Sequence, residues 1–338
     1  MDSVRPKSVG AVIPCPLSDD FDLRVDTDNV LGRLQLCLVA EPSSGDPALD
    51  EAEILITGIS TQAADPHDLV RRMPRLRWIH SVTAGVDDLV SEQLLERQIL
   101  LTNGSGAYAI AIAEYAFASM VMLCRGLPEL ISAQERRAWL GEHALGSELA
   151  GKRVGIVGFG GVGRSLARLC AAAGMSVWAL RRTSVKVDES DPVERVITPD
   201  QLPELLAASD FVVLAASLNP ASRGMVGHAE FGAIKSGAFV LNVSRGALID
   251  EAALTSAITS GRVAGAMLDV TAVEPLPKQS DLWHLPNVWI TPHMAGGTHE
   301  SRERAFRVLL ANVDNYLAGR VESMVNVVDV QRELAIAL

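Results

Sequence analysis

A glycine-rich segment in the middle of the chain constrains the fold more than any other feature. Residues 158–163 read Gly-Phe-Gly-Gly-Val-Gly, which is the pattern G-x-G-x-x-G. The segment directly follows an apolar run at 154–157 and directly precedes a helix-like run at 164–169. A strand, a glycine turn and a helix in this order are typical of a dinucleotide-binding loop. The pattern alone would also fit a mere tight turn, so its context carries the prediction.

Each glycine of this loop has its own physical reason. Gly158 permits the tight turn, Gly160 lets the backbone approach a pyrophosphate, and Gly163 lets the helix pack closely on the strand. The N-terminus of the following helix then offers free N–H groups and a positive dipole end to the phosphates. The segment therefore predicts a site for a dinucleotide cofactor.

Short apolar runs alternate with helix-like stretches on both sides of this loop. Before it we expect strands at 9–13, 34–40, 54–56, 76–82 and 99–102, and helices at 66–73, 87–96, 108–125 and 128–139. From the loop onward we expect six strands, at 153–157, 176–180, 211–215, 238–242, 265–269 and 288–291. The helices expected there lie near 162–173, 200–208, 228–234, 251–260 and 299–317. This alternation predicts an α/β fold with parallel sheets covered on both faces, the second of them doubly wound.

Composition narrows the function classes. A length of 338 residues favours two domains, and a net charge of −11 argues against a general nucleic-acid binder. No apolar run is long enough for a transmembrane helix, and the N-terminus lacks a signal-peptide layout. The four cysteines form no C-x-x-C pair, so we expect neither a zinc site nor a disulfide framework. A cytoplasmic protein without metal, nucleic-acid or membrane partners is the resulting expectation.

The residues after the second strand of the doubly wound unit bear on cofactor choice. An NAD site usually has an acidic residue there, which binds the ribose 2′-hydroxyl. Here the strand ends in Arg181, Arg182 and Thr183, with no acid. Two guanidinium groups can bind a 2′-phosphate, so the sequence predicts a preference for NADP(H), with NAD(H) still possible. The alternative is a solvated loop with two surface arginines.

Three polar residues each follow an expected strand at the edge of the sheet where ligands bind. Arg245 follows the strand at 238–242, Glu274 the strand at 265–269, and His293 the strand at 288–291. Taken singly, Arg245 could be a surface ion-pair residue, Glu274 part of a plain turn, and His293 a loop histidine.

Together with the glycine loop, this order of Arg, Glu and His resembles the D-isomer-specific 2-hydroxyacid dehydrogenase family, most of all its glyoxylate/hydroxypyruvate reductases. The resemblance covers roughly residues 75–317 and includes the segments 83–87 and 113–115. It implies a Rossmann-type nucleotide domain at 104–295, inserted into a discontinuous, flavodoxin-like substrate domain at 1–103 and 296–338. It also implies a homodimer built through the nucleotide domain, with the helix at 108–125 as a candidate contact that could equally be core.

The resemblance further implies hydride transfer from NAD(P)H to a small 2-keto acid, giving a D-2-hydroxy acid. His293 would be the general acid, Glu274 would bind its other ring nitrogen, and Arg245 would bind the substrate carboxylate and polarise the carbonyl. Backbone amides around Ala84 and Gly85 would hold the carboxylate as well. A phosphoglycerate dehydrogenase-like enzyme and a nucleotide-sensing, corepressor-like binding protein are the alternatives.

Other cofactor positions follow from the same resemblance. They are Gly161 and Val162 along the pyrophosphate, Ala216 and Ser217 on the adenosine side, Val243 near the nicotinamide and Asp269 as acceptor of its carboxamide. Asp269 could instead simply cap its strand. Ser217 departs from the family, which often has a proline there, and this puts the local loop shape in doubt. Trp139 could reach a neighbouring subunit's site or be an ordinary packed tryptophan.

Overall fold

The chain divides into two compact units. The computed structural model describes residues 9–13, 34–38, 47–58, 65–141, 146–182, 188 and 190–335. Unit 1 comprises residues 1–108 and 298–338, and unit 2 comprises residues 109–297. The sequence analysis predicts that the chain passes from one domain to the other after residues 103 and 295. Both predicted boundaries lie a few residues before those in the structure.

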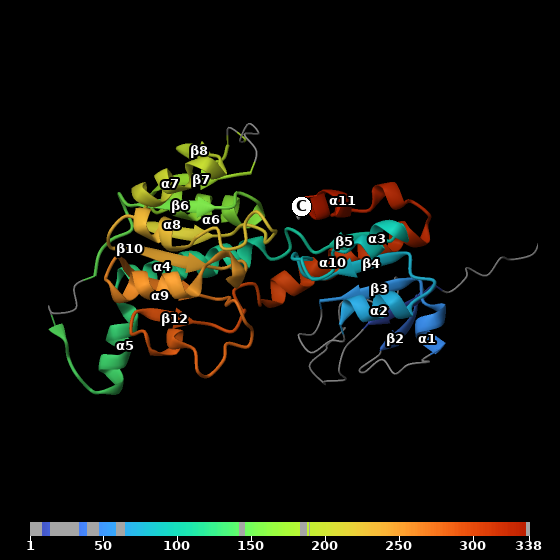
Figure 1. Ribbon diagram of the computed structural model, residues 1–338, viewed down its shortest axis with the longest axis horizontal. Helices are drawn as coiled ribbons and strands as arrows, with labels where there is room; N and C mark the ends of the chain where they lie inside the picture. The colour runs from blue at the N-terminus through green and yellow to red at the C-terminus, as the bar shows by residue number, and fades with distance from the viewer. Residues whose placement is uncertain are drawn as a thin grey trace, which may run out of the picture. The chain divides into compact units, whose positions relative to one another are not determined.

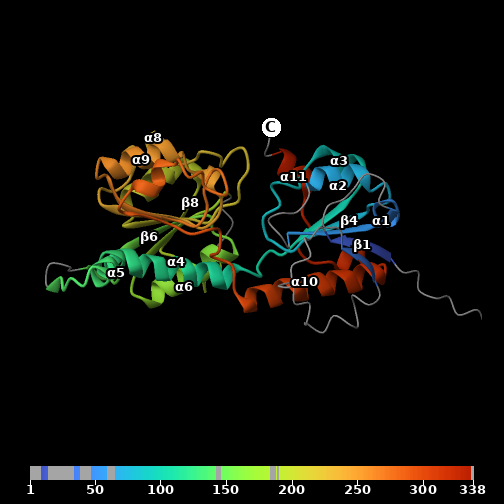
Figure 2. The same ribbon diagram turned by 90° about the horizontal axis from the view of Figure 1, so that it is seen from below.

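Unit 1 is built on a parallel sheet with the strand order β2-β1-β3-β4-β5. Its strands are β1 (Val9–Ile13), β2 (Leu34–Leu38), β3 (Ile54–Thr57), β4 (Trp78–Ser81) and β5 (Leu100–Asn103). Helices α1 (Pro47–Glu51), α2 (Pro66–Arg72), α3 (Glu92–Glu96) and α11 (Val330–Ala335) lie on one face, and α10 (His299–Leu317) lies on the other (Figure 2). This strand order is that of flavodoxin-like sheets, as the sequence analysis predicts.

The central strands of the unit 1 sheet are buried on both faces. All four residues of β4 are buried, and three of the four in β3 are as well. Leu69, Ile79 and Leu94 pack between the sheet and the helices of one face. Trp78 packs toward α10, where its ring stacks on Tyr316 with the centroids 5.0 Å apart. Strands buried on both sides are what a parallel sheet requires.

Unit 2 is built on a seven-stranded parallel sheet in the order β12-β11-β10-β9-β6-β7-β8 (Figure 1). Its strands are β6 (Arg153–Val157), β7 (Ser176–Leu180), β8 (Arg195–Ile197), β9 (Phe211–Leu214), β10 (Ala238–Asn242), β11 (Val263–Leu268) and β12 (Val288–Ile290). The order reverses between β6 and β9, so the sheet is doubly wound with its switch point after β6. The glycine loop at 158–163 begins at this switch point.

Helices cover both faces of this sheet. Helices α4 (Ala109–Cys124) and α6 (Gly161–Ala172) pack on each other and cover one face. Helices α7 (Leu202–Ala208), α8 (His228–Ala233) and α9 (Glu251–Thr259) cover the other (Figure 2). The short α5 (Leu127–Glu135) follows α4. All these helices were expected, with α4 and α6 within a residue of their predicted bounds.

The structure corrects several sequence-based boundaries. The sheet of unit 2 has seven strands rather than six. The missed strand β8, Arg-Val-Ile, begins with a charged residue and shows no continuous apolar run, unlike β12, which is equally short but apolar throughout. The helix expected at 87–96 begins only at Glu92, since residues 87–89 form turns and Ser91 is an extended N-cap. The helix expected at 128–139 ends at Glu135. Helices α1 and α11 were not predicted, and residues 39 and 40 of the second predicted strand lie outside the described residues.

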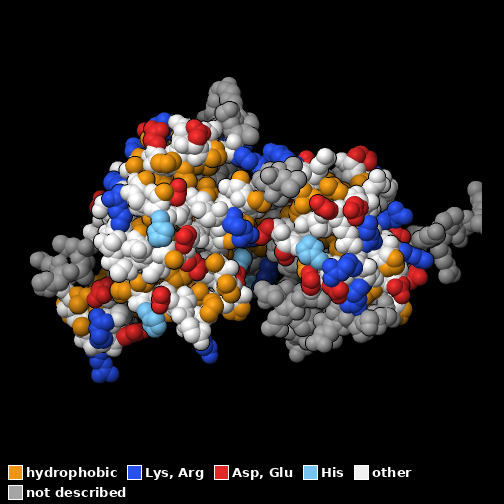
Figure 3. All heavy atoms as spheres, in the orientation of Figure 1, with side chains coloured by type: hydrophobic (Ala, Val, Ile, Leu, Met, Phe, Trp, Pro, Cys, Tyr) orange, Lys and Arg blue, Asp and Glu red, His pale blue; other side chains and the backbone are white. Residues whose placement is uncertain are grey.

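Two surface observations bear on the function classes. Among the described helices, none on its own has the length and apolar composition needed to cross a membrane, whereas α4 and α5 together do and meet at a bend of 68°. On the face drawn in Figure 3, the described basic and acidic side chains are interspersed over both units.

His80 is a fully buried polar residue of β4, the strand that leads into the 83–87 segment. Its Nδ1 lies 2.8 Å from Thr102 Oγ1, which also accepts a hydrogen bond from the indole of Trp78. Within the described part of the chain its Nε2 has no hydrogen-bond partner. Burial lowers the pKa of His80 from 6.5 to about 4, so the ring is neutral inside the sheet.

This burial makes the stability of unit 1 depend on pH. Between pH 6.5 and about 4 the unfolded chain protonates His80 while the folded chain does not. The contribution of His80 is therefore complete above pH 6.5 and falls by ~1.4 kcal/mol for each pH unit below it. The free energy of unfolding is measured with urea at pH 7, 6 and 5. Between pH 7 and 5 it should fall less in His80→Leu than in the wild type. The exposed-residue control His299→Gln should follow the wild type, and equal slopes for all three proteins would contradict this account.

Candidate active site

Three loops at the carboxyl ends of neighbouring strands carry the predicted polar residues. Arg245 follows β10, Glu274 follows β11 and His293 follows β12, and these strands are adjacent in the order β12-β11-β10. Because the strands are parallel, their carboxyl ends share one edge of the sheet. The fold of unit 2 thus gathers residues that lie up to 48 positions apart in the chain.

His293 and Glu274 are in direct contact. His293 Nδ1 lies 2.8 Å from Glu274 Oε2, with about half of the histidine side chain exposed. The other carboxylate oxygen of Glu274 accepts the backbone N–H of Thr271 at 3.1 Å, which fixes the carboxylate on its own loop. Since Nδ1 donates to the carboxylate, Nε2 is the ring nitrogen left for a substrate.

The loop that carries His293 is held by Asp269, the residue after β11. The carbonyl of Asp269 accepts His293 N–H at 2.8 Å, and its carboxylate accepts the N–H groups of Met294 and Ala295, each at 2.8 Å. The hydroxyl of Thr291 donates to the same carboxylate at 2.6 Å. Asp269 is only 2% exposed, so three donors of the chain itself occupy most of its lone-pair directions.

The Arg245 segment is shaped by Asn242, the last residue of β10. The Asn242 side chain donates to the carbonyl of Arg245 at 2.9 Å and accepts the N–H of Ser244 at 3.2 Å. The Ser244 hydroxyl in turn donates to the carbonyl of Ala216, after β9. The half-buried Arg245 guanidinium donates to the Ser244 carbonyl at 3.0 Å. Val243 is buried, whereas Ser217 is exposed.

The Arg245 and Glu274 loops touch through their backbones. A Cβ on Gly246 would lie 1.9 Å from the carbonyl carbon of Thr271, so only glycine allows this approach. The carboxylate of Glu251, in the first turn of α9, accepts the N–H of Ala272 at 2.6 Å. The structure therefore brings Arg245, Glu274 and His293 into one continuous set of loops.

The glycine loop has the shape that a dinucleotide requires. Gly158 has a φ of 103°, and a Cβ there would lie 2.5 Å from the backbone of Ala216. A Cβ on Gly163 would lie 2.4 Å from the Gly158 carbonyl oxygen. Gly160, by contrast, faces open space, and the N-terminus of α6 has no side-chain cap. The residues present, including Gly161 and Val162 in the first turn of α6, thus fit a bound pyrophosphate.

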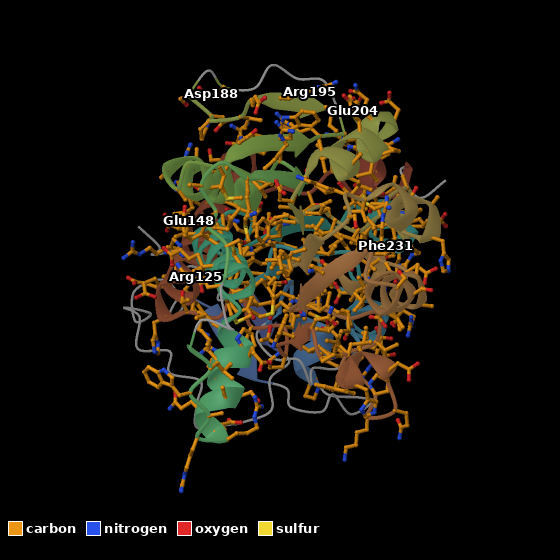
Figure 4. The ribbon with its side chains drawn as sticks, turned by 90° about the vertical axis from the view of Figure 1, so that its left-hand side faces the viewer. Arg125, Glu148, Asp188, Arg195, Glu204 and Phe231 are labelled. Carbon is orange, nitrogen blue, oxygen red and sulfur yellow. The ribbon has the colours of Figure 1, made fainter. Side chains whose placement is uncertain are left out.

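The predicted 2′-phosphate residues lie at the end of β7. Arg181 is half-buried, with its N–H bonded to Ile197 O, and Arg182 is exposed. Thr183 lies outside the described residues. Figure 4 shows Asp188 at the same end of the unit as Arg195, which pairs with Glu204.

The connection from β7 to β8 is anchored on α6. The carboxylate of Asp191 is fully buried and pairs with the guanidinium of Arg164. The guanidinium of Arg168 lies 3.8 Å from the same carboxylate. Both arginines belong to α6, so this contact ties Asp191, shortly before β8, to the helix that begins at the glycine loop.

The predicted carboxylate-binding loop lies in unit 1. Ala84 is exposed, and its carbonyl accepts a hydrogen bond from the Asn103 side chain at 2.8 Å. The Thr83 hydroxyl donates to Gly85 O at 3.2 Å. The Asn326 side chain donates to the carbonyls of both Asn103 and Ser105. This contact ties Asn103, which holds the 83–87 loop, to the C-terminal segment.

Sequence reasoning missed the residues that hold these loops. Asn242 and Asn103 bind the backbone carbonyls of the predicted residues Arg245 and Ala84. Glu251 binds the backbone of Ala272, two residues before Glu274. A polar residue at the end of an apolar strand was the available signal for Asn242 and Asn103. No group of His, Cys, Asp and Glu among the described residues could hold a metal ion.

Comparison with known proteins places this architecture. Residues 117–295 match the NAD-binding domain of the D-isomer specific 2-hydroxyacid dehydrogenases. The chain is 33% identical to a glyoxylate reductase of Thermococcus litoralis, over 80% of this chain and 82% of that protein. The chain belongs to the D-isomer specific 2-hydroxyacid dehydrogenase family. The resemblance inferred from the sequence is thereby confirmed, and so is the expected α/β fold.

Other family members differ in length and in the substrate they are named for. A D-3-phosphoglycerate dehydrogenase of Methanocaldococcus jannaschii is 31% identical over 84% of this chain, which spans only 54% of that longer protein. A solved family member from Xanthobacter autotrophicus Py2, in complex with NADPH and MES, aligns with a TM-score of 0.80 and 29% identity. That alignment covers 96% of this chain and 99% of the solved one.

Proposed function

We propose that this protein reduces a small 2-keto acid of the glyoxylate or hydroxypyruvate kind to the D-2-hydroxy acid. The observation that carries the proposal is the bond between His293 Nδ1 and Glu274 Oε2, on loops continuous with that of Arg245. A histidine braced by a carboxylate is suited to proton transfer, and a guanidinium is suited to binding a carboxylate. A bound nicotinamide dinucleotide would supply the hydride.

His293 gives the proton in this proposal. With Nδ1 bonded to Glu274, the imidazolium presents its Nε2–H to the keto oxygen and becomes neutral as that oxygen takes the proton. In the direction of oxidation, the neutral ring accepts the proton of the hydroxyl group. Glu274 accepts the Nδ1–H of the ring throughout and so holds its orientation.

Arg245 binds the substrate carboxylate and polarises the carbonyl beside it. Its segment is held by Asn242 and Ser244, so the guanidinium starts from a fixed backbone. In unit 1, we assign substrate binding to the backbone amides of Ala84 and Gly85. A phosphorylated substrate would call for further cations, and the sequence around residues 83–87 offers none.

We assign cofactor preference to the end of β7. Arg181 and Arg182 supply two positive charges where an NAD enzyme usually has an acidic residue, so the site favours the 2′-phosphate of NADP(H). Ala216 and Ser217 are assigned to the adenosine side and Val243 to the nicotinamide side.

The buried thiols of Cys124 and Cys170 fit a cytoplasmic location.

One experiment tests substrate and cofactor together. The rate of NADPH and NADH oxidation is measured with glyoxylate, hydroxypyruvate, pyruvate and 3-phosphohydroxypyruvate. We expect the highest kcat/KM with one of the first two and NADPH. The double variant Arg181→Ala/Arg182→Ala should lose on the order of tenfold or more in kcat/KM for NADPH while that for NADH stays constant.

The outcomes separate the alternatives. Preferred turnover of 3-phosphohydroxypyruvate would replace the proposal with a phosphoglycerate dehydrogenase-like activity. Absence of turnover with every keto acid, together with tight NADPH binding, would favour a nucleotide-sensing binding protein. Equal efficiency with both cofactors would overturn the NADP(H) preference alone.

We also propose a homodimer formed through unit 2. Eight of the 16 residues of α4 are buried and the helix packs on α6, so we assign the main contact to the segment that follows it. Large apolar side chains are exposed instead on α5 and just after it, namely Leu127, Leu130, Ile131 and Trp139, the last of them 98% exposed. A cluster of this kind favours a protein contact.

Light scattering of the purified protein should therefore give twice the chain mass of 36.1 kDa. Ile131→Asp, at the centre of the exposed cluster, should shift the mass toward that of one chain. A wild-type mass of 36.1 kDa would contradict the dimer.

A further inference from the structure

The His293 loop is connected to α4 by a chain of side-chain hydroxyl groups. The Tyr115 hydroxyl lies 2.6 Å from Thr291 Oγ1, and Thr291 Oγ1 lies 2.6 Å from Asp269 Oδ1. Asp269 in turn holds the backbone of the two residues that follow His293. Tyr115, Asp269, Thr291 and His293 all belong to unit 2, so the chain of contacts lies within one compact body.

The direction of each hydrogen bond follows from the chemistry of the groups. An ionised carboxylate only accepts, so Thr291 must donate its single proton to Asp269. Thr291 Oγ1 then has only lone pairs to offer Tyr115, and the phenol must be the donor. Burial raises the pKa of Tyr115, which keeps this proton in place at neutral pH. The order Tyr115 to Thr291 to Asp269 is therefore fixed.

The loop needs such support because of its backbone. His293 has a φ of 56°, a left-handed conformation that is unfavourable for a residue with a side chain. The conformation persists only where the surroundings hold it. Here Asp269 holds it, by accepting the N–H groups of 293, 294 and 295.

We propose that Tyr115 is a positioning residue for His293. The Tyr115 hydroxyl orients the Thr291 side chain, and Thr291 in turn fixes the buried carboxylate of Asp269. Asp269 then holds the left-handed turn that carries the imidazole of His293. The effect on turnover rests on the proposed function, whereas the effect on the loop does not. The assignment gives Asp269 a part in holding the catalytic loop that is independent of any contact with the cofactor.

The test uses variants that remove or keep single hydroxyl groups. Tyr115→Phe removes the donor, Thr291→Val removes the link at nearly constant shape, and Thr291→Ser keeps it. Ser119→Ala is the matched control on the same helix, because among the described residues its hydroxyl bonds to the backbone carbonyl of Tyr115 and to no part of the His293 loop. We expect Tyr115→Phe to lower kcat about fivefold, with the KM for NADPH unchanged.

A double-variant cycle distinguishes relay through Thr291 from a general structural role. In a relay, adding Tyr115→Phe to Thr291→Val costs no further activity, whereas independent effects would multiply. Thr291→Ser and Ser119→Ala should keep kcat within about twofold of the wild type. Multiplying losses, or an unchanged kcat in Tyr115→Phe, would overturn the proposal while leaving the reductase activity intact.

A second readout does not need turnover. Hydrogen exchange of the peptide that spans residues 291–297 reports the amides of Met294 and Ala295, which are bonded to Asp269. We expect exchange there to quicken about fivefold in Tyr115→Phe and Thr291→Val, and to be unchanged in Ser119→Ala. If no keto acid is turned over, the proposed function fails and this measurement still decides the inference. Equal exchange in all variants would overturn it.

Discussion

The buried carboxylate of Asp269 is the constraint on which the active-site geometry depends. A charge that is 2% exposed must be satisfied by hydrogen bonds, and the donors available are the amides after His293 and the Thr291 hydroxyl. Satisfying this one group therefore folds the loop after β12 into a left-handed turn at His293. The imidazole then meets Glu274, whose own loop is held by Thr271 and Glu251. The shape of the loop that carries His293 therefore follows from the hydrogen bonds that a neighbouring buried acid requires.

The parallel sheet of unit 2 explains why loops distant in sequence meet. Strands β10, β11 and β12 are hydrogen-bonded neighbours, and their register brings the ends of all three to one edge. Backbone approach finishes the arrangement, since Gly246 lies against the carbonyl of Thr271. The same principle operates at the switch point, where Gly158 lies against the backbone of Ala216. Two glycines therefore allow two pairs of loops to pack without a gap.

Much of this could be predicted from the sequence, and the reasons are physical. The strands β6, β7 and β10 are mostly apolar segments that begin or end with a polar residue, and their bounds were predicted to the residue. The glycine pattern predicted a tight turn at Gly158, where the structure has a φ of 103° that most other residues avoid. Strand β8 escaped detection because its three residues begin with Arg195 and form no continuous apolar run, whereas the equally short edge strand β12 does. The relay from Tyr115 also escaped, since it joins residues 176 positions apart through side-chain hydroxyl groups that no spacing rule connects.

The central claim is that His293, braced by Glu274, is the proton donor. It is tested most directly by measuring kcat and the NADPH dissociation constant of His293→Ala beside the wild type, with the best keto acid. The account predicts a loss of about 10²- to 10⁴-fold in kcat, with the dissociation constant unchanged. A variant that reduces the keto acid at the wild-type rate would contradict it.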